Sequence, residues 1–303
     1  MNENPPELAR QIYTSIQEEA ALAKEEGREF VVFSRRSYLD ALSAFDAAVC
    51  EASAVGQIQA GRMAAANVGY ATYVYAQMCG SGISMIRAAP LSRWVHSNFE
   101  NWHFGGVAGH ARAILEGYLL FFYLIEKPSS ENEMKARVNV MHLNDCSRRI
   151  EIFKNIGLSP DTVENFEKQR EEIRGRLTGN AYFSQLPSAV QKSCLSGKFL
   201  MISSRDEILE KIAFPKNQFN AIFDLYSQHT HILPLSFHRM EPNGRGTGLE
   251  NDVDRSYIGQ ALHLCAEILS AATDEIQEQF PDVAEVRKGI KSIFSPGPRS
   301  NRR

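Results

Sequence analysis

The segment Asn251–Phe280, NDVDRSYIGQALHLCAEILSAATDEIQEQF, is the longest periodic stretch of the sequence. Its apolar residues recur every three or four positions, the spacing that places side chains on one face of an α-helix. This stripe comprises Ile258, Leu262, Cys265, Ile268, Leu269, Ala272 and Ile276. A long helix with one apolar face needs other helices to cover that face, so the segment predicts a helical bundle.

The rest of the chain repeats the helical pattern. Residues 37–52 carry apolar positions three or four apart, and the apolar run 113–125 is typical of a buried core helix. Ser130–Glu133 and Ser204–Glu207 have the spacing of capping boxes, which begin helices. The one strand candidate, residues 199–202, is too short to build a sheet. We therefore predict an all-α fold, a multi-helix bundle.

The order of these segments suggests a division of the chain. Residues 101–294 are predicted to form the main helical bundle, and residues 1–100 form an N-terminal helical region that is a candidate subdomain. Residues 295–303, rich in Pro, Gly, Ser and Arg, are expected to be a disordered basic tail. Further helices are expected over 6–26, 57–79 and 90–99.

The amino-acid composition bears on which partners and which compartment suit this protein. The 33 Lys and Arg residues nearly balance the 36 Asp and Glu residues, so the net charge of −3 provides no general attraction for nucleic acid or an anionic membrane. The five cysteines are scattered and odd in number, which is typical of reduced thiols rather than a disulfide framework. These features predict a cytoplasmic protein without a membrane segment or a cofactor.

Two polar motifs stand within otherwise apolar helices. Arg112 and Glu116 lie four residues apart in the core helix, and Tyr226, Ser227 and His231 lie at the end of a later helix. One interpretation is a buried ion pair that fixes helix register. The other is a polar pocket in the bundle core, because a buried carboxylate is a typical site residue.

These motifs resemble a family of bacterial all-helical proteins that has no established activity. The resemblance covers roughly residues 109–238 and rests on an Arg-x-x-x-Glu core helix and a Tyr-Ser-x-x-x-His helix end. It implies that Arg112, Glu116, Ser227 and His231 meet inside the bundle. On this basis we expect a cytosolic module that binds a protein partner or a small ligand, a component of stress or phage defence and a candidate homodimer.

A second hypothesis is a ribonuclease. The spacing of Arg137 and His142 resembles the catalytic motif of HEPN-type ribonucleases, which are small helical bundles that act as dimers. In that case His142 would be the general acid or base, and Arg137 would stabilise the phosphate of an RNA substrate without a metal. RNA is expected as a partner only under this alternative.

A third hypothesis is a metal-dependent hydrolase. Three histidines, His229, His231 and His238, lie within ten residues, and Glu116 is a candidate fourth ligand. Histidines two apart on a helix do not face each other, so these side chains meet only if the chain turns sharply after the helix. Their spacing matches no established ligand pattern, and we predict no metal site.

Overall fold

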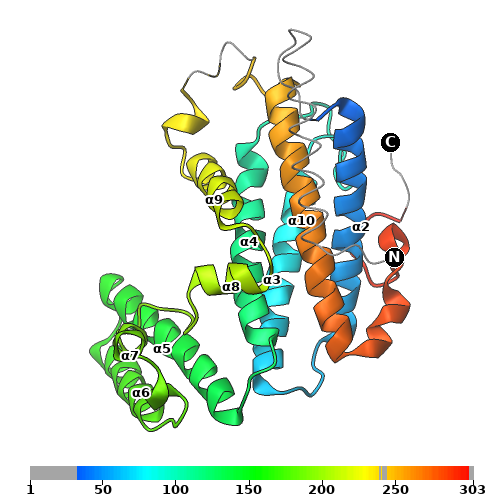
Figure 1. The fold of residues 1–303 in the computed structure, drawn as a ribbon. Helices are drawn as coiled ribbons and strands as arrows, with labels where there is room; N and C mark the ends of the chain where they lie inside the picture. Colours follow the sequence, from blue (N-terminus) through cyan, green and yellow to red (C-terminus); the bar gives the residue numbers. More distant parts are fainter. Residues whose placement is uncertain (1–32, 239, 241–243, 300–303) are drawn as a thin grey trace. The chain divides into compact units, whose positions relative to one another are not determined.

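A computed structural model describes residues 33–238, 240 and 244–299. This part of the chain contains helices and turns but no strand, which confirms the all-α prediction (Figure 1). The predicted helix 6–26 lies outside the described residues. The longer helices are α2 (Arg35–Gln59), α3 (Ala66–Ala88), α4 (Gly105–Ile125), α5 (Glu131–Asn155), α6 (Pro160–Thr178), α9 (Lys216–Thr230) and α10 (Asp252–Gln279).

Short helices connect these elements. They are η1 (Phe183–Gln185), α7 (Ser188–Leu195), α8 (Arg205–Lys211), η2 (Pro234–Ser236), η4 (Pro281–Val286) and η5 (Gly289–Lys291). Both predicted helix starts are capped: Ser130 and Ser204 accept hydrogen bonds from the backbone N–H groups of Glu133 and Glu207. The reciprocal bond of a capping box forms at Ser204, whose N–H donates to the carboxylate of Glu207, whereas the carboxylate of Glu133 accepts from the N–H of Ser129 instead. None of the described helices combines the length and apolar character needed to cross a lipid bilayer.

The chain forms two compact units. Among the described residues, unit 1 comprises 33–63, 72–121 and those from 209 to 299, and unit 2 comprises 64–71 and 122–208. The boundaries expected at residues 100 and 294 do not coincide with these units. The reason is that helices far apart in sequence pack together: α10 lies along α2 (Figure 1).

In unit 1, α10 buries the predicted apolar stripe against α2 and α3. All seven residues of the stripe are buried. The hydroxyl groups of Tyr75 on α3 and Thr273 on α10 are hydrogen-bonded at 2.8 Å inside this core. Gly82 allows α3 to approach closely, because a Cβ at this position would lie 3.1 Å from Leu269 Cδ1 and 3.2 Å from Val49 Cγ2.

In unit 2, α5 packs along α6, and α7 and η1 complete a separate apolar core. That core comprises Ala136, Val140, Leu143, Cys146, Ile150, Val163, Ile173, Leu177, Phe183 and Cys194. Arg137 lies beside it with an almost fully buried guanidinium group. Unit 2 thus has its own hydrophobic core and its own buried charge.

Three expectations about local structure were wrong. The predicted helix 57–79 is interrupted, because α2 ends at Gln59 and Gly61 adopts a left-handed conformation with φ 77° before α3 begins. Residues 90–99 form turns rather than a helix. The tail expected to be disordered from residue 295 is packed as far as Arg299, with Ser295 buried against unit 1. Residues 300–303 lie outside the described part.

Candidate functional site

Three of the predicted site residues meet where α4 and α9 adjoin. Arg112 on α4 donates a hydrogen bond from Nη1 to Nε2 of His231, at 2.8 Å, and its Nη2 lies 3.4 Å from Oε1 of Glu116. The guanidinium group of Arg112 also lies over the ring of Phe223 on α9, 4.7 Å from its centroid. We call Arg112, Glu116 and His231 the polar triad.

The polar triad lies at the surface, not in the bundle core. The side chain of Glu116 is 51% exposed and that of Arg112 is 22% exposed, and His231 is exposed as well. The prediction of a buried polar cluster was therefore wrong. The physical reason is that α9 has only 15 residues and covers the outer face of α4 incompletely, so polar side chains on that face reach solvent.

The other two predicted members have different surroundings. Tyr226 is buried, and its ring packs edge-on against Phe104 with the centroids 5.8 Å apart. Ser227 donates its hydroxyl hydrogen to the carbonyl oxygen of Phe223 in its own helix, at 2.6 Å. Tyr226 thus packs into the core and Ser227 bonds within its own helix, so neither adds a functional group to the polar triad.

The chain leaves α9 through a strained turn. Ile232 follows the C-cap residue His231 in a left-handed conformation with φ 52°, and the N–H of Leu233 donates to the carbonyl of Gln228 at 2.9 Å. This is a Schellman motif, in which the left-handed position is usually glycine. A β-branched residue in this conformation is a rare outlier. The turn therefore holds an isoleucine where glycine would fit without strain.

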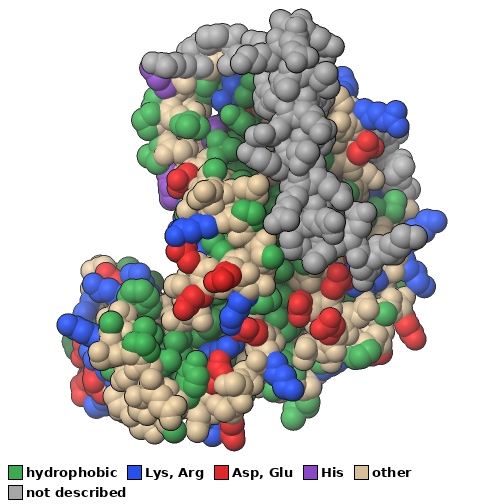
Figure 2. All heavy atoms as spheres, in the orientation of Figure 1, with side chains coloured by type: hydrophobic (Ala, Val, Ile, Leu, Met, Phe, Trp, Pro, Cys, Tyr) green, Lys and Arg blue, Asp and Glu red, His purple; other side chains and the backbone are tan. Residues whose placement is uncertain are grey.

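The same turn exposes a cluster of large apolar side chains. The exposed fractions are 74% for Ile232, 39% for Leu233, 52% for Leu235 and 54% for Phe237. We call these four residues the docking edge. Figure 2 shows hydrophobic side chains beside a histidine at the upper left, over the end of α9 seen in Figure 1. The docking edge is absent from the predicted site residues, although the sequence ILPLSF carries its signal: apolar residues after a helix end.

His229 occupies a buried pocket beside this turn. Its ring packs edge-on against Phe104 at 4.7 Å and lies 6.3 Å from the ring of Tyr257. The Nε2 atom is buried without a hydrogen-bond partner among the described residues. Burial, together with the positive charge of Arg245, lowers the pKa of His229 to about 4. The imidazole is therefore neutral at pH 7.

Arg245 and Asp254 form a buried ion pair near His229. Their side chains are 8% and 3% exposed, with Arg245 Nη2 3.0 Å from Asp254 Oδ1. The guanidinium group of Arg245 also lies 5.2 Å from the ring centroid of Tyr257. The ion pair attaches the loop before α10 to the first turn of that helix. Because Asp252 and Asp254 already place carboxylates in that turn, the helix end offers little attraction to a further anion.

The geometry does not support the metal hydrolase. His229 is enclosed by aromatic rings, whereas His231 is bound to Arg112 on the surface. Within the described ranges, no three His, Cys, Asp or Glu side chains lie close enough to hold a metal ion. The sharp turn after α9 thus leaves His229, His231 and His238 apart rather than bringing them together.

The ribonuclease residues lie in unit 2 and are engaged differently. Arg137 binds the carboxylates of Glu133 and Glu126, the latter at 3.1 Å, and the carbonyl of Tyr123 at 2.8 Å. Its guanidinium group is thus occupied inside the protein and is not presented to a phosphate. His142 is hydrogen-bonded at Nε2 to the hydroxyl of Tyr70, at 2.7 Å. Burial lowers the pKa of His142, with Arg176 adding to the effect.

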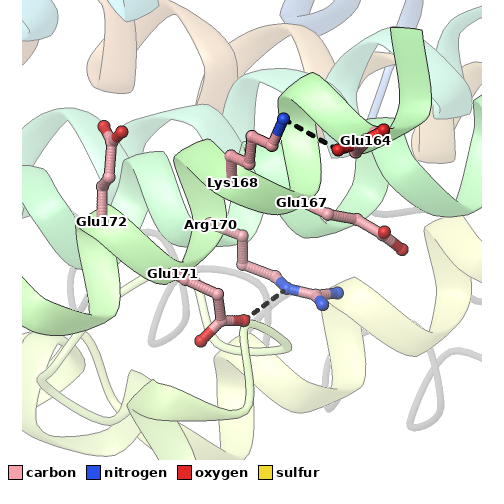
Figure 3. Close-up of a pocket in the computed structure, with 6 residues that line it drawn as sticks. All are labelled: Glu164, Glu167, Lys168, Arg170, Glu171 and Glu172. Atoms are coloured by element: carbon pink, nitrogen blue, oxygen red, sulfur yellow. Dashed lines mark hydrogen bonds and ion pairs between the residues drawn. The ribbon is translucent and has the colours of Figure 1, made fainter. Parts of the chain in front are cut away.

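A shallow depression lies on the outer face of α6, and its lining comes from that helix alone. Figure 3 shows Lys168 paired with Glu164 and Arg170 paired with Glu171, at 2.8 Å and 3.3 Å. The lining residues are Glu164, Glu167, Lys168, Arg170, Glu171 and Glu172. Lys168 and Arg170 are paired with glutamates of the same solvated helix, so we assign no site to this surface.

Comparisons of the chain with protein-family models, with curated proteins and with solved structures find no match. The docking edge and the adjoining polar triad together form the candidate site.

Proposed function

We propose that this protein is an interaction module that binds a partner protein through the docking edge. The single observation that carries the proposal is Ile232, which is three-quarters exposed in a left-handed conformation. Such a conformation costs an L-residue roughly 1–2 kcal/mol relative to its preferred geometry. The exposed side chain recovers little of this cost within the unit. Backbone strain of this kind is typical of functional sites.

The neighbours of Ile232 support an apolar contact. Leu233, Leu235 and Phe237 are exposed within the next five residues, so four exposed apolar side chains lie close together in the chain. Apolar side chains grouped on a surface and bordered by polar residues are typical of protein-binding sites. Here the polar triad provides such a border, because His231 directly precedes Ile232.

The partner we infer is a protein with a complementary apolar face. A small ligand is less well suited, because such ligands are largely enclosed in concave sites and the docking-edge side chains are 39–74% exposed. We place this interaction in the cytoplasm. All five cysteines are buried as free thiols, which suits a reducing compartment.

The test is a comparison of proteins captured from an extract of the producing cells. Wild type, Leu235→Glu and Ile152→Glu serve as baits, and quantitative mass spectrometry reads the bound proteins. Ile152 lies on α5 with an exposed fraction of 53%, almost equal to the 52% of Leu235, so it is a matched control. A buried charge in an interface core is costly. We expect at least one protein to bind wild type and Ile152→Glu and to be lost with Leu235→Glu.

If no protein shows this pattern, the proposal is wrong. Sedimentation of the purified protein tests whether the docking edge binds a second copy of this chain instead. If wild type dimerises and Leu235→Glu is monomeric, the docking edge joins two copies of this chain, and the foreign partner is excluded. Melting temperatures of the three baits confirm that each is folded.

A further inference from the structure

The segment 292–299 lies across α2 and the turn that follows α3. Arg93 donates from Nη1 to the carbonyl oxygen of Pro298. A Cβ on Gly297 would lie 2.9 Å from Sγ of Cys50 and 3.1 Å from the ring of Trp94, so only glycine fits this close approach. We call residues 292–299 the strap. It covers the Cys50 thiol from outside α2.

The side chains beneath the strap are hydrogen-bonded to one another independently of the strap. Asp46 accepts hydrogen bonds from Nε and Nη2 of Arg93, the latter at 2.9 Å, and from Nε1 of Trp94 at 2.7 Å. Asp46 and Arg93 are both largely buried, with side-chain exposures of 9% and 11%. This network fixes the guanidinium group by bonds that do not involve the strap, so it would persist if the strap moved.

The strap itself has weak attachments. Its two large apolar side chains, Ile293 and Phe294, are 57% and 48% exposed and bury little area. Arg299 binds the carbonyl groups of Ser292 and Ile293, which are bonds within the strap. Ser292, by contrast, is fully buried and donates its hydroxyl to the carbonyl of Gly289 at 2.7 Å. Beyond Ser292, the strap is held by the buried Ser295, whose side chain bonds to the Cys50 thiol, and by the bond from Arg93 to Pro298. A segment with few buried apolar contacts and a small number of polar attachments is a typical unit of local opening.

We propose that the strap opens as a unit about Ser292 while the helices of unit 1 stay folded, which uncovers Cys50, Arg93 and Trp94. In the closed state the strap occupies this polar surface and excludes other molecules from it. The inference is independent of the docking edge, which lies at the end of α9.

Cysteine labelling reports the opening directly. Burial raises the pKa of the Cys50 thiol to about 11, so the closed state holds an unreactive thiol. Cys265 lies inside the α10 core at 0% exposure, and burial raises its pKa further. The two cysteines separate local opening from global unfolding, because Cys265 becomes accessible only when the helices separate.

The experiment measures iodoacetamide labelling of each cysteine by mass spectrometry in the full chain. In wild type we expect Cys50 to react about tenfold or more faster than Cys265. Gly297→Ala forces the strap away from Cys50 and should raise the Cys50 rate about tenfold more, with the Cys265 rate unchanged. Gly80→Ala is the control, because a Cβ there meets nothing within 4 Å, and it should change neither rate.

Equal labelling rates for Cys50 and Cys265 in wild type would overturn the proposal, since Cys50 would then react only through global unfolding. So would a Gly297→Ala variant in which both rates rise together. If that variant does not fold, Ser295→Ala replaces it: Ser295 is buried and its side chain is hydrogen-bonded to the Cys50 thiol, so its loss should raise the Cys50 rate alone. An unchanged Cys50 rate in Ser295→Ala would also contradict the proposal.

Discussion

Arg112 on α4 and His231 at the C-cap of α9 share a hydrogen bond of 2.8 Å. A guanidinium group has no acceptor, so Nε2 of His231 must accept and its ring must carry the proton on Nδ1. This bond ties the C-cap of α9 to α4 immediately before the docking edge begins. The polar triad therefore fixes the direction in which the exposed apolar segment leaves the helix.

Because Glu116 is exposed, its substitution should lower the free energy of unfolding only slightly. Glu116→Gln removes a surface ion pair with a 3.4 Å separation, and such pairs contribute about 0.3–0.5 kcal/mol. We expect the free energy of unfolding to fall by less than 1 kcal/mol, measured by urea denaturation. A fall of about 3–5 kcal/mol, which is typical of breaking a buried pair, would contradict the surface position found here.

The conformation of Ile232 makes a glycine substitution favourable. Ile232→Gly removes left-handed strain of roughly 1–2 kcal/mol, partly offset by the greater freedom of glycine in the unfolded chain. We expect a net gain of up to about 1 kcal/mol, seen as a higher melting temperature. Leu233→Gly is the control: its φ of −84° is ordinary, so glycine there should lower stability. If Ile232→Gly lowers stability as Leu233→Gly does, the turn is not strained.

The sequence was sufficient to predict the local features of the fold. The stripe of α10 and the capping box at Ser204 depend on spacings within one segment, and both form as predicted. The break between α2 and α3 was not predicted, because the apolar pattern continues across it. Helical periodicity does not show where the chain changes direction. Gly61, in a left-handed conformation, was the available signal.

The candidate site depends on contacts that the sequence does not record. Whether Glu116 is buried is decided by how much of α4 the short helix α9 covers, and this is a tertiary property. The strain at Ile232 was equally hidden, because a left-handed C′ position is recognised in sequence by glycine or asparagine and here holds isoleucine. Local rules fail most often at functional sites, which agrees with the role proposed for this turn.

The buried charge of unit 2 predicts a large effect for Arg137. Arg137→Ala leaves Glu133 buried without its cation, and breaking such a pair costs about 3–5 kcal/mol. We expect a strong loss of stability in urea denaturation. Arg148→Ala on the same helix is the control, since its side chain is 60% exposed and its loss should cost less than 1 kcal/mol. Similar small effects for both variants would mean that Arg137 is not structural.

The pocket of His229 predicts a pH-dependent stability. Burial and Arg245 lower the pKa of His229 in the folded chain to about 4, compared with 6.5 for an unperturbed histidine. As the pH falls from about 6.5 towards 4, the unfolded chain binds a proton that the folded chain excludes, so unfolding becomes easier. The stabilising contribution of neutral His229 is thus present above pH 6.5 and lost in acid.

His229→Phe removes this titration and retains an aromatic ring beside Phe104. We expect the stability of the variant relative to wild type to increase on going from pH 7.5 to pH 5, by on the order of 1–2 kcal/mol after allowance for solvent screening. Urea denaturation at several pH values measures this difference. His96→Phe, at an exposed position, should show no such change with pH. If the difference between His229→Phe and wild type is constant with pH, the pocket does not exclude the charged imidazole.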